Sequence, residues 1–458
     1  MRILIAGGGQ VAALVAARLI REGNEITIVE EGAERCQELE QALDAKIVQG
    51  SAASIRTLHK AGLRDTEMLI AATSIDHVNV LACLIAQVEA GVKVKLARIR
   101  THEVEDWQRL LQEAGLHIDL IIHPETETSE RILRVLRVPG VSDIFDFAEG
   151  RVKLFGMNID RHSRAAGKTL LELGAAGLPR NTRMAMIFRG PQVIIPAGND
   201  VLRTGDHVYI VTTAQNLPAV YQFMGLQTQE SLERVFIIGG KQLGIAVAEK
   251  LERQGVSVKL FEREAERCEK IAQILNKTVV IHADGTDQSV LSQENVEGVG
   301  AFCALTGDDE DNIMASLLAR RLGARKVVAL VNRLNYLPMA QMLGLNTTVS
   351  PRLAAVDRIL QFVRKGPVIS VTTFRAEESE AIELIASAGS KYLGKKLRDL
   401  RLPRGAIVGA IARPNGEVIV PRGDASIEAG DRVLFFSLES SVPSLESAFL
   451  AEPRRKPK

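Results

Sequence analysis

The sequence predicts two doubly wound α/β domains with parallel sheets, each followed by a small α+β domain. The first observation is a long internal repeat in the 458-residue chain, in which Arg2-Ile-Leu-Ile-Ala-Gly-Gly-Gly-Gln-Val returns as Arg234-Val-Phe-Ile-Ile-Gly-Gly-Lys-Gln-Leu. The second is that short apolar strands alternate with helical segments in each copy, which is typical of parallel sheets with crossover helices. A repeat of this length indicates a duplicated pair of domains and not a solenoid of short units.

Six short β-type runs predict the sheet of the first domain, which we expect over residues 1–140. They lie at 2–6, 25–30, 46–49, 67–72, 93–98 and 118–122. Helical spacing fills the early intervals between them, as a βαβ succession requires. An amphipathic helix over 128–138, followed by Pro139-Gly140, is expected to end this domain.

The sequence changes character over residues 141–228, where turn signals separate short strands and predict a small α+β domain. These strands are expected at 151–157, 184–188, 193–196 and 207–212. The second half repeats the plan, with a doubly wound domain over 232–366 and a small domain over 367–450. The basic residues 451–458 are expected to be a disordered tail.

Composition excludes several classes of protein. Lys and Arg number 57 against 56 Asp and Glu, so the sequence provides no general basic field and a nucleic-acid partner is not expected. Its four cysteines lack CxxC spacing, which argues against a zinc site or a disulfide framework, and we expect no bound metal. Because no apolar run reaches about 18 residues and no signal segment opens the chain, we expect a cytoplasmic protein.

The first glycine turn, Gly7-Gly8-Gly9-Gln10-Val11-Ala12, has the GxGxxA pattern of a Rossmann-like dinucleotide site. Gly7 permits the tight turn, and Gly9 lets the backbone approach a pyrophosphate that the following helix N-terminus attracts. Glu30 ends the second strand, where its carboxylate would accept hydrogen bonds from ribose hydroxyls and repel a 2′-phosphate. The pattern favours NAD or ATP over NADP, although a glycine turn can also be purely structural.

The second glycine turn, Gly239-Gly240-Lys241-Gln242-Leu243-Gly244, departs from the pattern at its middle position. Lys241 replaces the glycine there, and its side chain should crowd a pyrophosphate lying across the turn. Glu262 is retained as the possible ribose acceptor. An altered ligand, weaker binding and no binding all remain open for this half.

Two threonines, Thr73 and Thr306, lie just past the fourth strand of each copy. The carboxyl ends of parallel strands form the edge of the crevice, so both are placed to touch a ligand. Asp76 and Asp309 follow them, and helix N-caps are a slightly better interpretation of these carboxylates than ligand contacts.

Further candidates follow other strands of the two sheets. Asp284 comes after the third strand of the second copy, where the first copy has Gly50-Ser51. Arg98 and Arg100 end the fifth strand of the first copy, with Arg333 in the related place of the second. Arginine at such an edge can neutralise phosphate, and a surface ion pair is an equally good interpretation.

No catalytic machinery is evident in the small domains. A dehydrogenase needs a proton donor or acceptor near the nicotinamide. His162 and His207 of the first small domain have no counterpart in the second, where Gly389 and Arg432 fall. We therefore expect a nucleotide sensor and no enzyme.

The chain as a whole resembles the TrkA family, the peripheral NAD-binding subunits of bacterial Trk potassium uptake systems. These proteins are built of two tandem pairs of an RCK N-terminal (KTN) domain and an RCK C-terminal domain. The resemblance covers residues 1 to 450, and the duplicated architecture is its most specific part. The runs that carry it are Ile5-Ala-Gly-Gly-Gly-Gln-Val, Ala97-Arg98-Ile-Arg100, Asp146-Phe-Ala-Glu-Gly150, Asp309-Glu-Asp-Asn312-Ile-Met-Ala, Gly205-Asp206 and Gly430-Asp431.

This resemblance implies that NAD(H), ATP or ADP binds the KTN domains and that the protein forms a homo-oligomeric ring, expected to be a homotetramer. The ring would contact the cytoplasmic face of a membrane-embedded potassium transporter, and nucleotide binding would shift its conformation and gate that transporter. The first site carried over from the family consists of Gly7, Gly9, Glu30, Thr73, Arg98 and Arg100. Two alternatives remain: a soluble NAD-dependent oxidoreductase, and an assembly scaffold whose glycine turns are structural.

Overall fold

The computed structural model divides the chain into two units, which we describe separately. The first contains residues 1–127 and 351–364, and the second contains 128–350 and 365–458. The predicted tail and His162 lie outside the described residues. The described ranges are 1–100, 104–138, 140–161, 163–190, 192–226, 232–345, 347–363, 368–374 and 379–450.

The first unit is built on a six-stranded parallel sheet of order β3-β2-β1-β4-β5-β6. The order reverses between β1 and β4, and ligands of doubly wound sheets bind at the carboxyl ends of the strands at such a point. This order confirms the predicted doubly wound fold. The strands are β1 Arg2–Ala6, β2 Glu25–Glu30, β3 Lys46–Gln49, β4 Met68–Ala71, β5 Val94–Arg98 and β6 Leu120–Ile122, and the helices that accompany them are α1 Gln10–Arg21, α2 Ala33–Ala42, α3 Ile55–Lys60, α4 Asp76–Ala90 and α5 Val104–Glu113.

A second sheet of the same topology, β14-β13-β12-β15-β16-β17, lies in the second unit. Its central strands are as apolar as those of the first sheet, as a sheet covered on both faces requires. Its strands are β12 Arg234–Ile238, β13 Ser257–Glu262, β14 Val279–His282, β15 Ala301–Ala304, β16 Val327–Leu330 and β17 Thr348–Val349, and its helices are α9 Gln242–Arg253, α10 Ala265–Ile274, α11 Gln288–Gln293, α12 Asp309–Arg321 and α13 Leu337–Met342.

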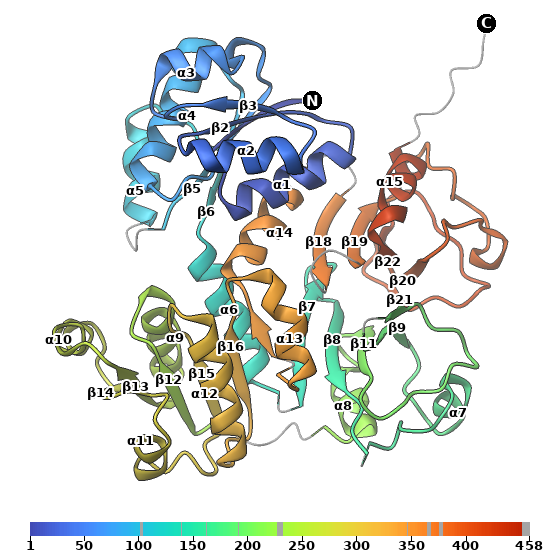
Figure 1. The fold of residues 1–458 in the computed structure, drawn as a ribbon. Helices are drawn as coiled ribbons and strands as arrows, with labels where there is room; N and C mark the ends of the chain where they lie inside the picture. Colours follow the sequence, from blue (N-terminus) through green and yellow to red (C-terminus); the bar gives the residue numbers. More distant parts are fainter. Residues whose placement is uncertain are drawn as a thin grey trace, which may run out of the picture. The chain divides into compact units, whose positions relative to one another are not determined.

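One helix of each half is exchanged between the two cores. In the first unit, α14 (Pro351–Val363) buries Ile359 and Leu360 beneath the first sheet, and in Figure 1 it is the orange helix among blue elements. In the second unit, α6 (Pro124–Leu136) buries Ile132 and Leu133 in the core of the second sheet. The helix expected to end the first domain therefore packs on the other sheet, because an amphipathic pattern specifies an apolar face and not the surface that covers it.

Lys326 fastens the end of α6 within the second unit. Its buried ammonium donates to the main-chain oxygens of Val138 at 2.8 Å and Val141 at 2.7 Å, and also to that of Val135. Val135 lies in the last turn of α6, Val138 follows the helix, and Val141 begins β7, so Lys326 joins the end of the helix to the start of the next strand.

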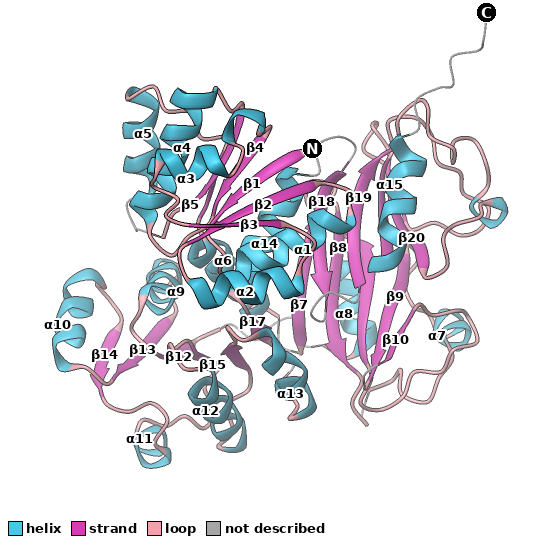
Figure 2. Cartoon of the chain, turned by 45° about the horizontal axis from the view of Figure 1, so that its top comes forward, coloured by secondary structure: helices cyan, strands magenta, loops and turns pink. Residues whose placement is uncertain are grey.

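The two small domains each form a five-stranded antiparallel sheet, and these sheets pack face to face in the second unit (Figure 2). The shared core contains Phe188, Tyr209, Phe374 and Phe436, while α8 (Leu217–Met224) and α15 (Val442–Leu450) cover the outer faces. The strands are β7 Val141–Phe147, β8 Val152–Asn158, β9 Thr182–Arg189, β10 Gln192–Ile194, β11 His207–Thr213, β18 Val368–Phe374, β19 Ser379–Ile385, β20 Ala406–Ala412, β21 Val418–Ile419 and β22 Arg432–Leu438, and a short helix α7 (Leu170–Ala175) follows β8.

Strand β7 was absent from the sequence prediction. Ser142, Asp143 and Asp146 interrupt its apolar pattern. In the structure the Asp143 carboxylate is satisfied, because it pairs with Arg131 and accepts a hydrogen bond of 2.9 Å from the Tyr209 hydroxyl. Among the described residues, no helix is both long enough and apolar enough to cross a membrane.

Candidate nucleotide-binding site

Two glycines of the first turn differ in role: the fold requires a glycine at Gly7, whereas packing within the protein does not require one at Gly9. Gly7 has φ +101°, and a Cβ there would lie 2.9 Å from the Cα of Thr73. Gly9 has φ −62°, and no atom of the described residues lies within 4 Å of the position its Cβ would take. A side chain at Gly9 would therefore enter open space, which is what a site for a closely approaching ligand requires.

Glu30 is held at the turn by main-chain donors. Its carboxylate accepts from the Gly8 N–H at 2.6 Å and from the Gly32 N–H at 2.9 Å. Arg35 completes this arrangement by donating to the Gly8 carbonyl oxygen at 2.7 Å. Each carboxylate oxygen has a second lone pair, so Glu30 can still accept from ribose hydroxyls.

Two arginines place positive charge at the end of β5, at the same carboxyl edge of the sheet as the glycine turn. The Nε of the half-buried Arg98 is itself buried and has no hydrogen-bond partner among the described residues. Burial and the neighbouring charge of Arg100 lower the pKa of Arg98. Arg100 lies near a carboxylate, with its Nε 3.5 Å from the Glu125 Oε1. An anion bound here would supply the partner that Arg98 lacks.

Thr306 lines the pocket of the second sheet, and Thr73 holds the equivalent place in the first copy; both also fix the loops that carry them. Their hydroxyls donate to Asn79 Oδ1 at 2.7 Å and to Asn312 Oδ1 at 2.8 Å. The two fully buried asparagines in turn donate to the carbonyl oxygens of Arg98 and Leu330, at 2.8 and 3.1 Å. Neither asparagine was predicted as a site residue, although a threonine followed six residues later by asparagine recurs in both copies.

The N-cap interpretation of Asp76 and Asp309 is wrong. Asp76 accepts from the main-chain N–H of Arg100 at 2.9 Å, and Asp309 accepts from that of Arg333 at 2.6 Å. Each carboxylate therefore ties the start of a helix to the end of the next strand. The N-cap of α12 is Asp308, whose side chain accepts from the Asp311 N–H at 2.9 Å.

The second copy does not reproduce the arginines of the first. Leu330 occupies the place of Arg98, since both carbonyls accept from the equivalent asparagine. The Arg333 guanidinium lies on the surface, 2.9 Å from Glu310 Oε1 and 2.9 Å from the Tyr336 hydroxyl. The surface ion pair is therefore the better interpretation of Arg333.

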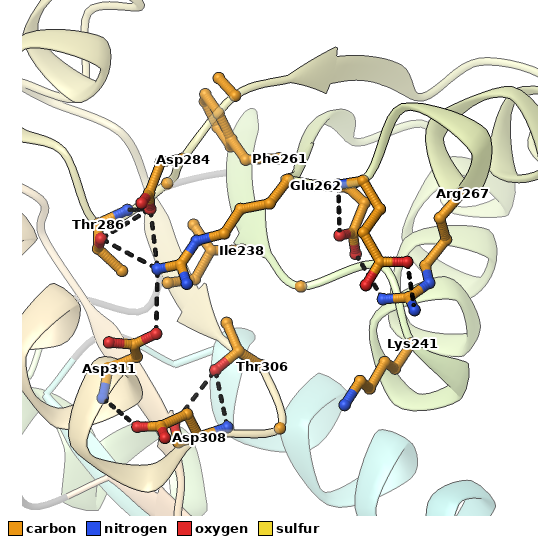
Figure 3. A pocket seen from close by; sticks show the side chains of 16 residues that line it. Ile238, Lys241, Phe261, Glu262, Arg267, Asp284, Thr286, Thr306, Asp308 and Asp311 are labelled. Atoms are coloured by element: carbon orange, nitrogen blue, oxygen red, sulfur yellow. Dashed lines mark hydrogen bonds and ion pairs between the residues drawn. The ribbon is translucent and has the colours of Figure 1, made fainter.

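Lys241 extends across a pocket of about 230 Å³ at the carboxyl edge of the second sheet. Its ammonium lies against Gly307, in the space that a side chain at that glycine would occupy. In Figure 3, Lys241, Glu262 and Arg267 lie on one side of the pocket, and Asp284 and Asp311 lie on the other. The volume is below the range of about 300–1,000 Å³ that is typical of small-molecule sites.

Charged groups in this pocket pair with one another. Arg263 lies 3.0 Å from both Asp284 and Asp311. Burial raises the pKa of Asp284, but hydrogen bonds from Thr286 and Arg263 outweigh burial and leave that pKa below its usual value. The lining holds five carboxylates and three cationic side chains, which disfavours a polyphosphate.

Glu262 is more enclosed than Glu30, with 7% of its surface exposed. It accepts from the Gly240 N–H at 2.8 Å and from the Glu264 N–H at 3.1 Å, and Arg267 lies 3.5 Å away. Burial raises the pKa of Glu262, but these donors outweigh burial and leave that pKa below its usual value.

The predicted site residues thus lie at the carboxyl edges of the two sheets, but one of their side chains, that of Val11, does not face the edge. Val11 is buried in the core beneath the first sheet, so only its main chain faces the turn. The four cysteines are free thiols, and the described residues contain no group of three His, Cys, Asp or Glu that could hold a metal ion.

Comparison with known protein families agrees with this duplicated plan. The model of the TrkA-N domain matches residues 3–124 and again 235–351, and the model of the TrkA-C domain matches 154–225 and 381–450. The Trk system potassium uptake protein TrkA of Halomonas elongata is 35% identical over 442 residues, which are 96% of each chain. The protein of the same name from Vibrio alginolyticus is 34% identical over 458 residues, covering 99% of each chain.

A similar fold occurs in a solved structure described as the GsuK channel bound to NAD. It superposes with a TM-score of 0.60 over 98% of this chain and 78% of that one, at 20% sequence identity. At this identity the likeness establishes the fold alone.

Proposed function

Because the chain belongs to the family of the Trk system potassium uptake proteins TrkA, we propose that it is the nucleotide-binding regulatory subunit of a potassium uptake system. NAD(H) or an adenine nucleotide binds the first half, and no bond is made or broken. The observation that carries this proposal is the open space at Gly9, at the sheet edge that also carries the Glu30 carboxylate and the arginines at the end of β5.

The ligand would span the first glycine turn. Its ribose hydroxyls would donate to Glu30, and its phosphates would face the N-terminus of α1, Arg98 and Arg100. The GsuK channel, which shares the fold, was solved with NAD bound, and this supports the same ligand class here. A 2′-phosphate would meet the negative charge of Glu30, so NADPH binds more weakly than NADH.

The second pocket has a different role in this proposal. Gly239, Glu262, Asp284 and Thr306 line it, and the Gly240 N–H donates to Glu262. Its small volume and its net negative lining argue against a pyrophosphate across the second glycine turn. We propose that it takes no dinucleotide, and that nucleotide sensing belongs to the first half.

Regulation requires a ring that can change conformation. Leu81, Leu84 and Val88 lie on one face of α4, and 39%, 41% and 70% of their surfaces are exposed. Second copies of the chain would cover this face in a homotetrameric ring on the inner side of the membrane. A nucleotide shifts such a ring only by the difference in its affinity for two conformations, and that shift would gate the partner transporter.

Thermal unfolding of the purified protein with NADH, NAD⁺, NADPH, ATP and ADP tests the proposal. A ligand at 100 times its Kd adds about 2.7 kcal/mol to the stability of the state it binds. We expect NAD(H) or ATP to stabilise the wild-type protein and the Glu31→Ala control, and not the Glu30→Ala variant. Stabilisation by none of these nucleotides would leave an assembly scaffold, and steady consumption of NADH with a small substrate would indicate an oxidoreductase.

A further inference from the structure

Arg352 approaches the first glycine turn from the exchanged helix. It is the second residue of α14, and its Nη1 donates to the side-chain oxygen of Gln10. Gln10 is the first residue of α1 and follows Gly9 directly. The charge of Arg352 also acts on Arg98, because it is among the causes that lower the pKa of Arg98. A residue from the second half of the sequence therefore lies at the phosphate end of the first site.

The groups at this point carry more positive than negative charge. The charges of Arg100 and Arg352 both act on Arg98, and Arg352 contacts the first residue of the 12-residue helix α1, whose free N–H groups add partial positive charge. The nearby carboxylates are engaged: Asp76 accepts from the main-chain N–H of Arg100, and Glu125 lies 3.5 Å from the Arg100 side chain. Clustered guanidinium groups repel one another unless an anion lies between them.

Two further observations point to a ligand here. The Nε of Arg98 is buried without a hydrogen-bond partner among the described residues, and the space beside Gly9 is open. A phosphate group supplies three acceptor oxygens and negative charge, and arginine binds it with two parallel hydrogen bonds.

We propose that Arg352 is a phosphate ligand of the first nucleotide site, supplied by helix α14 from the second half of the same chain. This inference rests on the proposed nucleotide site and adds a residue to it. The ligand class is a nucleoside diphosphate, a nucleoside triphosphate or a dinucleotide. Adenosine alone, which lacks phosphates, does not engage Arg352.

The position of Arg352 in the chain gives this contact a regulatory consequence. The segment of the first unit that contains α14 is preceded and followed in the sequence by segments of the second unit. A phosphate held jointly by α1 and α14 therefore fixes the short segment by which the second half of the chain enters and leaves the first unit. Binding of a polyphosphate, but not of adenosine, should protect the amides of 351–363 from hydrogen exchange.

Calorimetric titration of the full chain with ATP, ADP and adenosine tests the assignment. We expect Arg352→Gln to weaken ATP and ADP binding about tenfold, as loss of one charge-assisted contact implies, and to leave adenosine binding unchanged. The matched control is Arg358→Gln on the same helix, where Arg358 lies 3.7 Å from Glu127. This control should bind all three ligands as the wild-type protein does.

Several results would overturn the assignment. If Arg352→Gln binds ATP normally while Glu30→Ala does not, the nucleotide site stands and Arg352 is not part of it. If adenosine binding falls as much as ATP binding, the substitution acts through the fold, which the unfolding temperature of the ligand-free variant also reveals. If the wild-type protein binds no nucleotide, both this inference and the proposed function fail.

Discussion

Gly9→Lys should remove nucleotide binding without harming the fold. The substitution copies Lys241 of the second half into a position with φ −62°, where no described residue other than the chain neighbours comes within 4 Å of the new Cβ. We therefore expect the stability of the ligand-free protein to change by at most about 0.5 kcal/mol. The lysine side chain would occupy the space through which a pyrophosphate approaches, so the affinity should fall at least about 100-fold.

The size of the effect follows from mass action. At a nucleotide concentration of about 100 times the wild-type Kd, binding adds about 2.7 kcal/mol to the wild-type protein, but about 0.4 kcal/mol or less to the variant. For a unit of about 150–250 residues, 1 kcal/mol shifts Tm by about 2–4 °C, so the ligand-induced shift should fall from about 5–10 °C to about 1 °C. Differential scanning fluorimetry with NADH and ATP resolves this difference.

Gly7→Ala is the contrasting variant. Its positive φ and its approach to the Thr73 Cα should destabilise the ligand-free protein by about 1–3 kcal/mol. The reasoning is refuted if Gly9→Lys keeps the full nucleotide shift, or if it destabilises the ligand-free protein as much as Gly7→Ala does.

Three further predictions concern the second half of the chain. Lys241→Gly should leave the second pocket without nucleotide affinity, because its five carboxylates remain. Tight ATP binding by the Glu30→Ala, Lys241→Gly double variant, in which the first site is disabled, would contradict this. Burial lowers the pKa of Lys326 to about 7, so between about pH 7 and 10 the unfolded chain binds more protons than the folded protein. The free energy of unfolding should therefore rise with pH across this window, by up to about 1.4 kcal/mol per pH unit. Chemical denaturation of Lys326→Met at several pH values should show a flatter profile. Ile359→Ala should cost about 2–5 kcal/mol and expose amides of α1 in the first unit, as hydrogen exchange can show, whereas protection lost only in the second unit would disprove the helix exchange.

The sequence predicted the sheets well because their signals are local. Apolar runs of four to six residues, bounded by glycines and separated by helical spacing, match all six strands of the first sheet. Glu30 and Gly9 were also accessible, since the end of β2 and the turn after β1 lie at one edge in any doubly wound fold. Strand β7 was missed because its aspartates look like loop residues until Arg131 and Tyr209 are placed around Asp143.

Long-range partners could not be predicted in the same way. The pattern of α14 shows an apolar face, but nothing in it says that Ile359 and Leu360 complete the first sheet's core. Arg352 was missed for the same reason, because it is 342 positions from Gln10 in the sequence. Asp76 and Asp309 were misassigned because a carboxylate at a helix start can bind either its own helix or the neighbouring strand, and only the sheet order places that strand within reach.

The exchange of α6 and α14 also constrains how the chain matures on the ribosome. The core beneath the first sheet is incomplete until α14, which ends at Val363 and packs against it, has been synthesised. More than 200 residues must be added after the first sheet before α14 is complete, at a synthesis rate of about 5–20 residues per second. The apolar surface beneath the first sheet therefore stays partly exposed until most of the polypeptide has been synthesised. Because more than 200 residues separate the first sheet from α14 in the sequence, we expect their association to be a slow step of folding.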